Sequence, residues 1–328
     1  MLLNYTLLTA GLLLLYFGAD WLVRGSSSLA RSFNISPIVV GLTVVAFGTS
    51  APEMVVSAVA SLQNKSMIAI GNVVGSNICN IALVLGATAL IMPIRAARSV
   101  VNRDIPIMLL ISVLVLFLSW NAEISRAEGL FLFAGIIIYS LFNYHVSKKE
   151  PLSADTGLGV RVETELLHIG YIDSRPKQAL MIIVGIAGVL TGAQVLIDNA
   201  VIIMKTFGVD EKFIGLTIVA LGTSLPELAT SIVAALRKEL DISIGNLVGS
   251  NVFNLLSVIG VTAIIRPIPI PGGLVDSGLI VDYGVMMAIS VLPWLMMKNN
   301  YTMERKDGIV LLCCYVCYLA YLIISGAV

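Results

Sequence analysis

Residues 41–86 read GLTVVAFGTSAPEMVVSAVASLQNKSMIAIGNVVGSNICNIALVLG, and residues 215–260 read GLTIVALGTSLPELATSIVAALRKELDISIGNLVGSNVFNLLSVIG. The two stretches align without a gap at an offset of 174, and 25 of the 46 positions are identical. The identical positions include glycines, prolines, serines, asparagines and one acid per copy, Glu53 and Glu227. Apolar helices that pack in lipid do not require such polar and helix-breaking residues. The match therefore indicates an internal repeat.

The chain around the repeat is too apolar for a water-soluble protein. Of its 328 residues, 58% are hydrophobic and 12% are charged, and the mean hydropathy is +0.96. A soluble domain has about 25% charged residues. The net charge is zero, without the basic excess that nucleic-acid binding needs. We therefore expect an all-α integral membrane protein whose partner is the lipid bilayer, since the apolar runs do not alternate as barrel strands do.

Long runs without charged residues predict ten membrane-spanning helices, because about 20 apolar residues span the hydrocarbon. The predicted spans are 3–23, 36–61, 67–91, 105–120, 127–145, 178–204, 213–236, 242–265, 280–297 and 308–326. Five spans separate the start of each copy of the repeat. Because five is odd, the second copy enters the membrane from the opposite side, and inverted repeats of this kind are typical of transporters.

The basic residues predict the orientation of the chain. With ten spans, 15 of the 20 Lys and Arg residues fall on one side of the membrane and 5 on the other. Positive residues stay on the cytoplasmic side, so both termini are expected outside a plasma (inner) membrane. The predicted organisation is a first half at 1–146, a cytoplasmic loop at 147–177 and a second half at 178–328.

Glu53 and Glu227 lie near the middle of otherwise uncharged predicted helices. A carboxylate at this depth is costly and is usually functional. The alternative is a structural acid that holds the bundle together, but the duplication one residue after a proline argues against it. Each proline removes the helical partner of the carbonyl four residues earlier, at Gly48 and Gly222. Freed carbonyls beside a carboxylate would form a cage of hard oxygen ligands.

Polar residues at a spacing of four extend this cage in each copy. Thr49 and Glu53, and Ser76 and Asn80, are predicted to share a helix face, as are their counterparts in the second copy. Calcium takes six to eight oxygen ligands in flexible geometry, a number that these side chains supply. The sequence has only two His and four Cys, in no cluster that would favour a softer metal.

At GTSAPE…GSNICN and GTSLPE…GSNVFN the sequence resembles the calcium/cation antiporter superfamily, whose alpha repeats carry these paired motifs. The resemblance implies ten helices in two inverted five-helix halves, four central cation sites and transport of calcium and sodium ions by alternating access. It implies no enzyme activity and no bound cofactor, since the ions are cargo, and we expect a monomer. The carried-over ligands are Glu53, Glu227, Thr49, Thr223, Ser50, Ser224, Ser76, Ser250, Asn80, Asn254, Ala46 and Ala220.

Several alternatives stay open at this stage. Exchange of calcium for sodium is the first interpretation, and a calcium/proton antiporter or a potassium-dependent sodium/calcium exchanger is the alternative. Some family members have an Asp where this chain has Asn254, which leaves potassium transport in doubt. A cation channel is the nearest candidate from another class, but channels need a continuous pore and usually several subunits. A hydrolase would need a nucleophile with a base, and neither Ser50 nor Ser224 has a His or Lys nearby in its helix.

Overall fold

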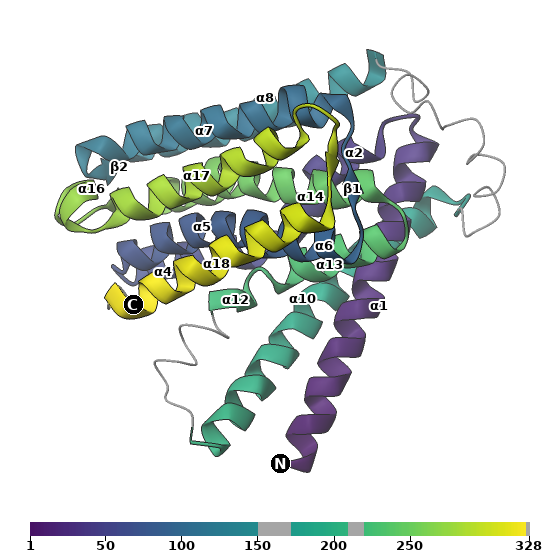
Figure 1. Ribbon diagram of the computed structural model, residues 1–328, viewed down its shortest axis with the longest axis horizontal. Coiled ribbons are helices and arrows are strands. Elements are labelled where there is room, and N and C mark those ends of the chain that lie inside the picture. Colours follow the sequence, from purple (N-terminus) through teal and green to yellow (C-terminus); the bar gives the residue numbers. More distant parts are fainter. Residues whose placement is uncertain (150–171, 209–219, 326–328) are drawn as a thin grey trace.

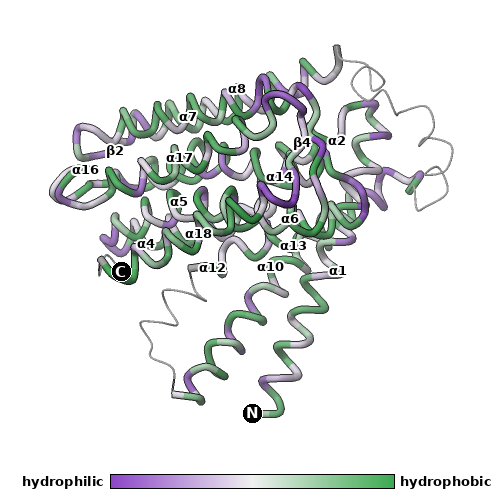
Figure 2. The backbone as a smooth tube through the Cα atoms, in the orientation of Figure 1, coloured by the Kyte–Doolittle hydropathy of each residue, from purple (hydrophilic) through white to green (hydrophobic). Residues whose placement is uncertain are grey.

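The computed structural model describes residues 1–149, 172–208 and 220–325, and nearly all of its regular structure is helical. Within these described ranges, eight helices are long and apolar enough to cross a membrane. They are α1 (Leu2–Ser32), α5–η2–α6 (Ser66–Cys79, Asn80–Leu85, Gly86–Ile91), η3–α7–η4 (Val100–Asp104, Ile105–Leu118, Ser119–Asn121), α8 (Arg126–Lys149), α10 (Arg175–Thr206), α14–η6–α15 (Leu240–Phe253, Asn254–Val258, Ile259–Ile265), α17 (Leu279–Met297) and α18 (Arg305–Ser325). Hydrophilic residues gather at the turns and helix ends, and hydrophobic residues cover most of the helix lengths (Figure 2).

The second predicted span is broken rather than continuous. Residues Pro37–Thr49 and Ala51–Leu62 form two helical pieces bent by 44° relative to one another, and the pair counts as a ninth span. The first piece consists of α2 (Pro37–Val40), the π-helical turn η1 (Gly41–Val45) and α3 (Ala46–Thr49), and the second is α4 (Ala51–Leu62). Ser50 lies at the break. The break follows from Pro52, because proline in the first turn of α4 cannot continue the helical hydrogen bonding of α3.

The seventh predicted span, 213–236, is described only in its second part. Its described pieces are α12 (Ala220–Gly222) and the apolar helix α13 (Leu225–Leu236), which occupy the positions of α3 and α4 in the first copy. Residues 209–219 lie outside the described residues, as does most of the predicted loop 147–177, of which 150–171 is not described. The division of the chain into the halves 1–146 and 178–328 therefore stays a prediction.

Helices α1 and α10 run antiparallel along one another and extend away from the rest of the bundle (Figure 1). Their contact is formed by glycines. A Cβ atom added at Gly18 would lie 2.6 Å from the backbone nitrogen of Val189, and one at Gly192 would lie 2.5 Å from that of Leu15. Gly11 and Gly185 make the matching close contacts. Small residues permit such close approach of helices in lipid, and the antiparallel contact is what inverted halves require.

Charged side chains hold one end of α1 against the turn between α13 and α14. Asp20 is buried, and it lies 3.1 Å from Arg24 Nε and 2.6 Å from Arg237 Nη2. The Arg237 contact is electrostatic, because it does not meet hydrogen-bond geometry. Arg31 forms a 3.0 Å ion pair with Glu239. These contacts explain why α1 continues to Ser32, nine residues beyond the predicted end at 23, since Arg24 and Arg31 are paired inside the helix instead of marking a loop.

The two halves also interlock at the other helices. Gly86 and Gly308 bring α6 against α18, and Gly129 and Gly260 bring α8 against α15 in the same way. Two short antiparallel ladders connect the halves further: β1 (Ile94–Arg95) pairs with β4 (Thr302–Met303), and β2 (Glu123–Ile124) pairs with β3 (Ile268–Pro269). The short helix α16 (Gly273–Asp276) follows β3. Helix α14 lies at the centre, where every residue from Ile242 to Phe253 is buried.

Candidate cation-binding site

The two helix breaks place both acids in equivalent positions. Glu53 lies in the first turn of α4, directly after the break at Ser50, and Glu227 lies in the first turn of α13, directly after Ser224. A helix N-terminus carries partial positive charge and favours a carboxylate there. Thr49 ends α3, so it lies across the break from Glu53 and does not share one continuous helix with it as the spacing predicted. The break therefore sets the geometry of the site.

Both carboxylates lie inside the protein. Their side chains are fully buried, and Glu227 is near enough to act electrostatically on Glu53. Ser50 Oγ from the first half donates a 3.2 Å hydrogen bond to Glu227 Oε1 from the second. Ser76 and Thr223 lie near Glu53, but neither reaches it in hydrogen-bond geometry. The structure thus brings the acids and hydroxyls of both halves to one centre.

Six buried oxygen atoms at this centre have no hydrogen-bond partner among the residues that the structure describes. They are both carboxylate oxygens of Glu53, Oε2 of Glu227, the amide oxygens of Asn80 and Asn254, and Oγ of Ser224. A buried polar atom without a partner costs about 1–3 kcal/mol. All six belong to residues predicted as ligands, and they are six of the eleven buried side-chain atoms without a hydrogen-bond partner among the described residues, so a cation bound here would offset about half of that cost.

Asn80 and Asn254 occupy matching places in the helices that follow the acids. Each begins a π-helical turn, η2 and η6 respectively, and such turns are frequent at functional sites. The Asn80 amide nitrogen donates to Asn251 Oδ1 (3.2 Å), and the Asn254 amide nitrogen donates to Asn77 Oδ1 (3.1 Å). The oxygens of both amides are therefore turned away from these partners and remain free.

Four of the remaining predicted ligands have hydrogen-bond partners: Ser50, Thr49, Ser250 and Ala46. Thr49 Oγ1 lies 3.1 Å from Asn246 Oδ1 and 3.4 Å from the Ser250 hydroxyl. The Ala46 carbonyl accepts the backbone N–H of Ser50 at 2.9 Å. Ala220 begins α12, and Thr223 follows that helix and is half-buried.

Sequence reasoning did not include Asn77, Asn251 or Asn246 in the site, although all three contact predicted ligands. The signal was present, because each of these asparagines is identical to its counterpart in the other copy of the repeat. The sequence does not distinguish an asparagine whose amide oxygen faces the centre from one whose amide bonds a neighbouring ligand residue.

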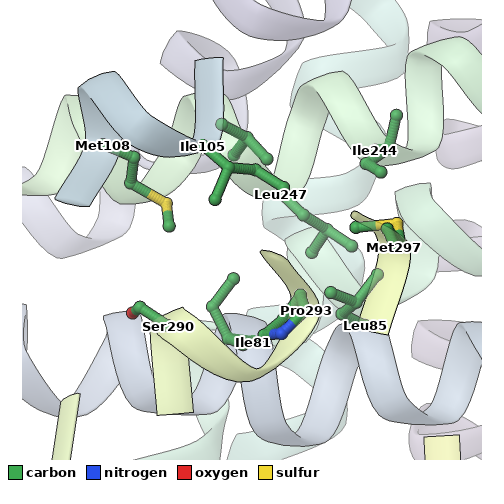
Figure 3. Close-up of a pocket in the computed structure, with 10 residues that line it drawn as sticks. Ile81, Leu85, Ile105, Met108, Ile244, Leu247, Ser290, Pro293 and Met297 are labelled. Atoms are coloured by element: carbon green, nitrogen blue, oxygen red, sulfur yellow. The ribbon is translucent and has the colours of Figure 1, made fainter. Parts of the chain in front are cut away.

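A separate small pocket lies between η2, α7, α14 and α17 and does not fit a cation (Figure 3). Apart from Ser290, its lining consists of apolar side chains such as Ile81, Met108, Leu247 and Met297. The centre defined by Glu53 and Glu227 is chemically different. Its donors are all oxygen atoms, and the described part of the chain contains no cluster of three or more His, Cys, Asp and Glu residues. Such a donor set suits hard cations.

Comparison with known proteins agrees with this chemistry. The family profile described as Sodium/calcium exchanger protein matches residues 3–145 and 177–324. The chain belongs to the sodium/calcium exchanger family. This match confirms the resemblance to the calcium/cation antiporters that the repeat motifs indicated. It also confirms the prediction that the chain is a transporter and not an enzyme.

Individual relatives align with this chain over almost its full length. CaxA of Alkalimonas amylolytica is 38% identical over 321 residues, which are 96% of this chain and 97% of CaxA. Sodium/calcium exchanger MaX1 of Methanosarcina acetivorans is 32% identical over an alignment of 351 positions that covers 97% of this chain and 98% of MaX1. The structure of the sodium-calcium exchanger NCX_Mj without sodium and calcium superposes with a TM-score of 0.82 at 33% identity, covering 98% of this chain and 99% of that one. The chain is therefore an all-α, multi-pass membrane antiporter of the sodium/calcium exchanger type.

Proposed function

We propose that this protein is a secondary active antiporter that exchanges calcium for sodium by alternating access. The observation that carries the proposal is the group of six unpartnered buried oxygens around Glu53 and Glu227. Two carboxylates offset the charge of one calcium ion, and calcium requires six to eight oxygens at about 2.3–2.6 Å. The twelve predicted ligand residues are proposed to form this calcium site and the neighbouring sodium sites, and no resident cofactor is part of the proposal.

Sodium is favoured as the counter-ion by the neutral oxygens of the site. A carboxylate alone suffices to carry a proton, whereas Thr49, Ser250, Asn80 and Asn254 add ligands that only a metal cation would use. The names of MaX1 and NCX_Mj describe sodium/calcium exchangers, which supports the same assignment. Because an antiporter must hold one cargo or the other, calcium and sodium are proposed to compete for shared oxygens.

A calcium/proton antiporter is the second candidate. Glu53 and Glu227 repel one another, and both Glu53 oxygens lack a partner in the described residues, so a proton could replace calcium there. Co-transport of potassium is a further variant of the sodium mechanism. It is less favoured, because Asn254 makes the centre symmetric and leaves it with two acids.

Ion flux in proteoliposomes tests the coupling ion. Vesicles loaded with sodium and diluted into sodium-free buffer should take up calcium, and equal sodium on both sides should stop the uptake. Adding potassium on either side should leave the rate unchanged. Calcium uptake driven by a proton gradient in the complete absence of sodium would overturn the sodium assignment in favour of the calcium/proton mechanism.

The orientation and assembly of the protein are also proposed. Both termini face outward, residues 147–177 face the cytoplasm, and the protein functions as a monomer in the plasma (inner) membrane. The charge distribution of 15 basic residues against 5 supports the orientation. Both cargo-binding halves lie in one chain, which supports the monomer.

A further inference from the structure

We propose that Asn77 and Asn251 are positioning residues that turn the amide oxygens of Asn80 and Asn254 toward the transported cation. This inference rests on the proposed function, because it concerns the same central site. Neither residue contacts the cation itself in the proposal. Each holds the ligand that the opposite half of the molecule supplies.

Two backbone carbonyls determine which way the first pair of amides points. Asn77 Nδ2 donates to the backbone oxygen of Asn251 at 3.3 Å, and Asn251 Nδ2 approaches the backbone oxygen of Asn77 at 3.5 Å. A backbone carbonyl can only accept a hydrogen bond. The nitrogen of each side-chain amide must therefore face that carbonyl, and its Oδ1 must point the other way.

The orientation of the first pair dictates the orientation of the second. Oδ1 of Asn77 accepts the amide N–H of Asn254 at 3.1 Å, and Oδ1 of Asn251 accepts the amide N–H of Asn80 at 3.2 Å. Since Oδ1 only accepts, Asn80 and Asn254 must offer it their nitrogens. Their own oxygens then point elsewhere, and these are two of the six unpartnered oxygens of the site.

Burial makes this arrangement effective. Asn77, Asn80, Asn251 and Asn254 are each at most 1% exposed, so water cannot readily replace a missing partner. An amide rotated by half a turn would present an N–H donor to the centre, and a donor repels a cation that an amide oxygen binds. The two positioning residues thus keep the site composed of oxygen.

The hydrogen bonds cross between the halves, which gives the proposal a distinctive signature. Asn77 and Asn80 belong to the first copy, and Asn251 and Asn254 are their counterparts at an offset of 174. Asn77 nevertheless holds Asn254, and Asn251 holds Asn80. Energetic coupling should follow these crossed pairs and not the pairs that are close in sequence.

Double-mutant cycles in reconstituted protein test this signature. Asn77→Ala should raise the calcium concentration for half-maximal uptake by about tenfold, as loss of a residue that orients a metal ligand typically does, with little change in maximal rate. The same substitution should have no further effect in an Asn254→Ala background. In an Asn80→Ala background it should again raise the half-maximal concentration by about tenfold. Asn251→Ala should show the reverse pattern. It should leave the half-maximal calcium concentration unchanged in an Asn80→Ala background and raise it in an Asn254→Ala background.

Controls separate positioning from a general structural role. Asn199→Ala removes a buried amide that bonds Val195 O in α10, and it should leave the half-maximal calcium concentration unchanged. A merely structural role for Asn77 would lower the thermal unfolding temperature and the maximal rate in every background. If Asn77→Ala does not fold, Asn77→Ser takes its place, because its hydroxyl fills part of the space but is one bond too short to hold Asn254.

The possible outcomes are distinct for the two proposals. Additive effects of Asn77→Ala and Asn254→Ala, or equal coupling of Asn77 to both ligands, would overturn the positioning role while sodium-driven calcium uptake by the wild type still supports the proposed function. Absence of sodium-driven uptake in the wild type would overturn the proposed function alone. The cycles are then measured on equilibrium binding of calcium to the purified protein, with the same crossed pattern expected.

Discussion

Glu53 and Glu227 are fully buried, and each supplies one of the two negative charges of the central site. Glu53→Gln and Glu227→Gln should each abolish calcium exchange in proteoliposomes while the protein still folds. Removing one partner from a buried charge interaction costs about 3–5 kcal/mol, which corresponds to a loss of about two to three and a half powers of ten in calcium affinity at about 1.4 kcal/mol per tenfold. Flux and thermal unfolding are measured on the same preparations.

Asp282→Asn is a suitable control for these variants. Asp282 also lies in a membrane-spanning helix, where it accepts a hydrogen bond from Tyr318 at 3.0 Å, but it is not part of the proposed site. Its substitution should leave calcium exchange near normal. Near-normal calcium exchange by either glutamine variant would contradict a shared site with two carboxylates. Ser57→Ala is a poorer control, since Ser57 is buried and bonds both Ala69 O and Asn72 between α4 and α5.

At this scale the sequence indicated candidate ligands but not how their side chains are oriented. Duplication identified Glu53, Glu227, Asn80 and Asn254, because polar residues inside apolar helices are costly in lipid and are usually functional where they occur. The directions of the Asn80 and Asn254 amides depend on Asn77 and Asn251, whose own amides bond backbone carbonyls 174 positions away in the chain. Such a contact leaves no trace in local spacing.

Among the helices, α1 and α10 depend on glycine for their contact. Gly192→Ala would place a methyl group 2.5 Å from the backbone nitrogen of Leu15, and the backbone cannot move aside as a side chain can. Overpacking of this kind typically costs about 1–3 kcal/mol. We expect a lower unfolding temperature in detergent, measured by the loss of monodisperse protein on heating.

Gly284→Ala provides the matched control for this contact. Gly284 also lies within a membrane-spanning helix, α17, but no heavy atom from another part of the described chain lies within 4 Å of an added Cβ. Its unfolding temperature should stay at or above that of the wild type, since alanine favours helix over glycine by up to about 1 kcal/mol. Equal unfolding temperatures for Gly192→Ala and the wild type would show that the helices can separate without cost.

Helix boundaries were predicted less well than helix positions. The sequence indicated where apolar runs lie, and Pro52 indicated a disturbance, but an unbroken run at 36–61 was expected instead of two pieces bent at Ser50. The end of α1 was placed too early, because a charged residue looks like a loop until its partner is known. Asp20 and Glu239 supply those partners from within and beyond the helix.

For the whole molecule, single-cysteine labelling in intact cells tests the proposed orientation. The four native cysteines, Cys79, Cys313, Cys314 and Cys317, are first replaced. A cysteine introduced at position 328 should then react with an impermeant reagent, whereas one introduced within 147–177 should react only after the membrane is made permeable. Labelling in the reverse order would overturn the orientation derived from the charge asymmetry.

Two identical inverted halves would give the inward-open and outward-open forms the same free energy. This chain departs from that equality, because Asp20 pairs with Arg237 at one end while the equivalent positions at the other end are Gln194 and Gln63. A partly exposed ion pair is worth about 0.2–1 kcal/mol, enough to shift a two-state population by up to about fivefold. The pair should therefore favour the conformation in which α1 contacts the turn between α13 and α14, and Arg237→Gln should shift the accessibility of the two entrances to an impermeant thiol reagent.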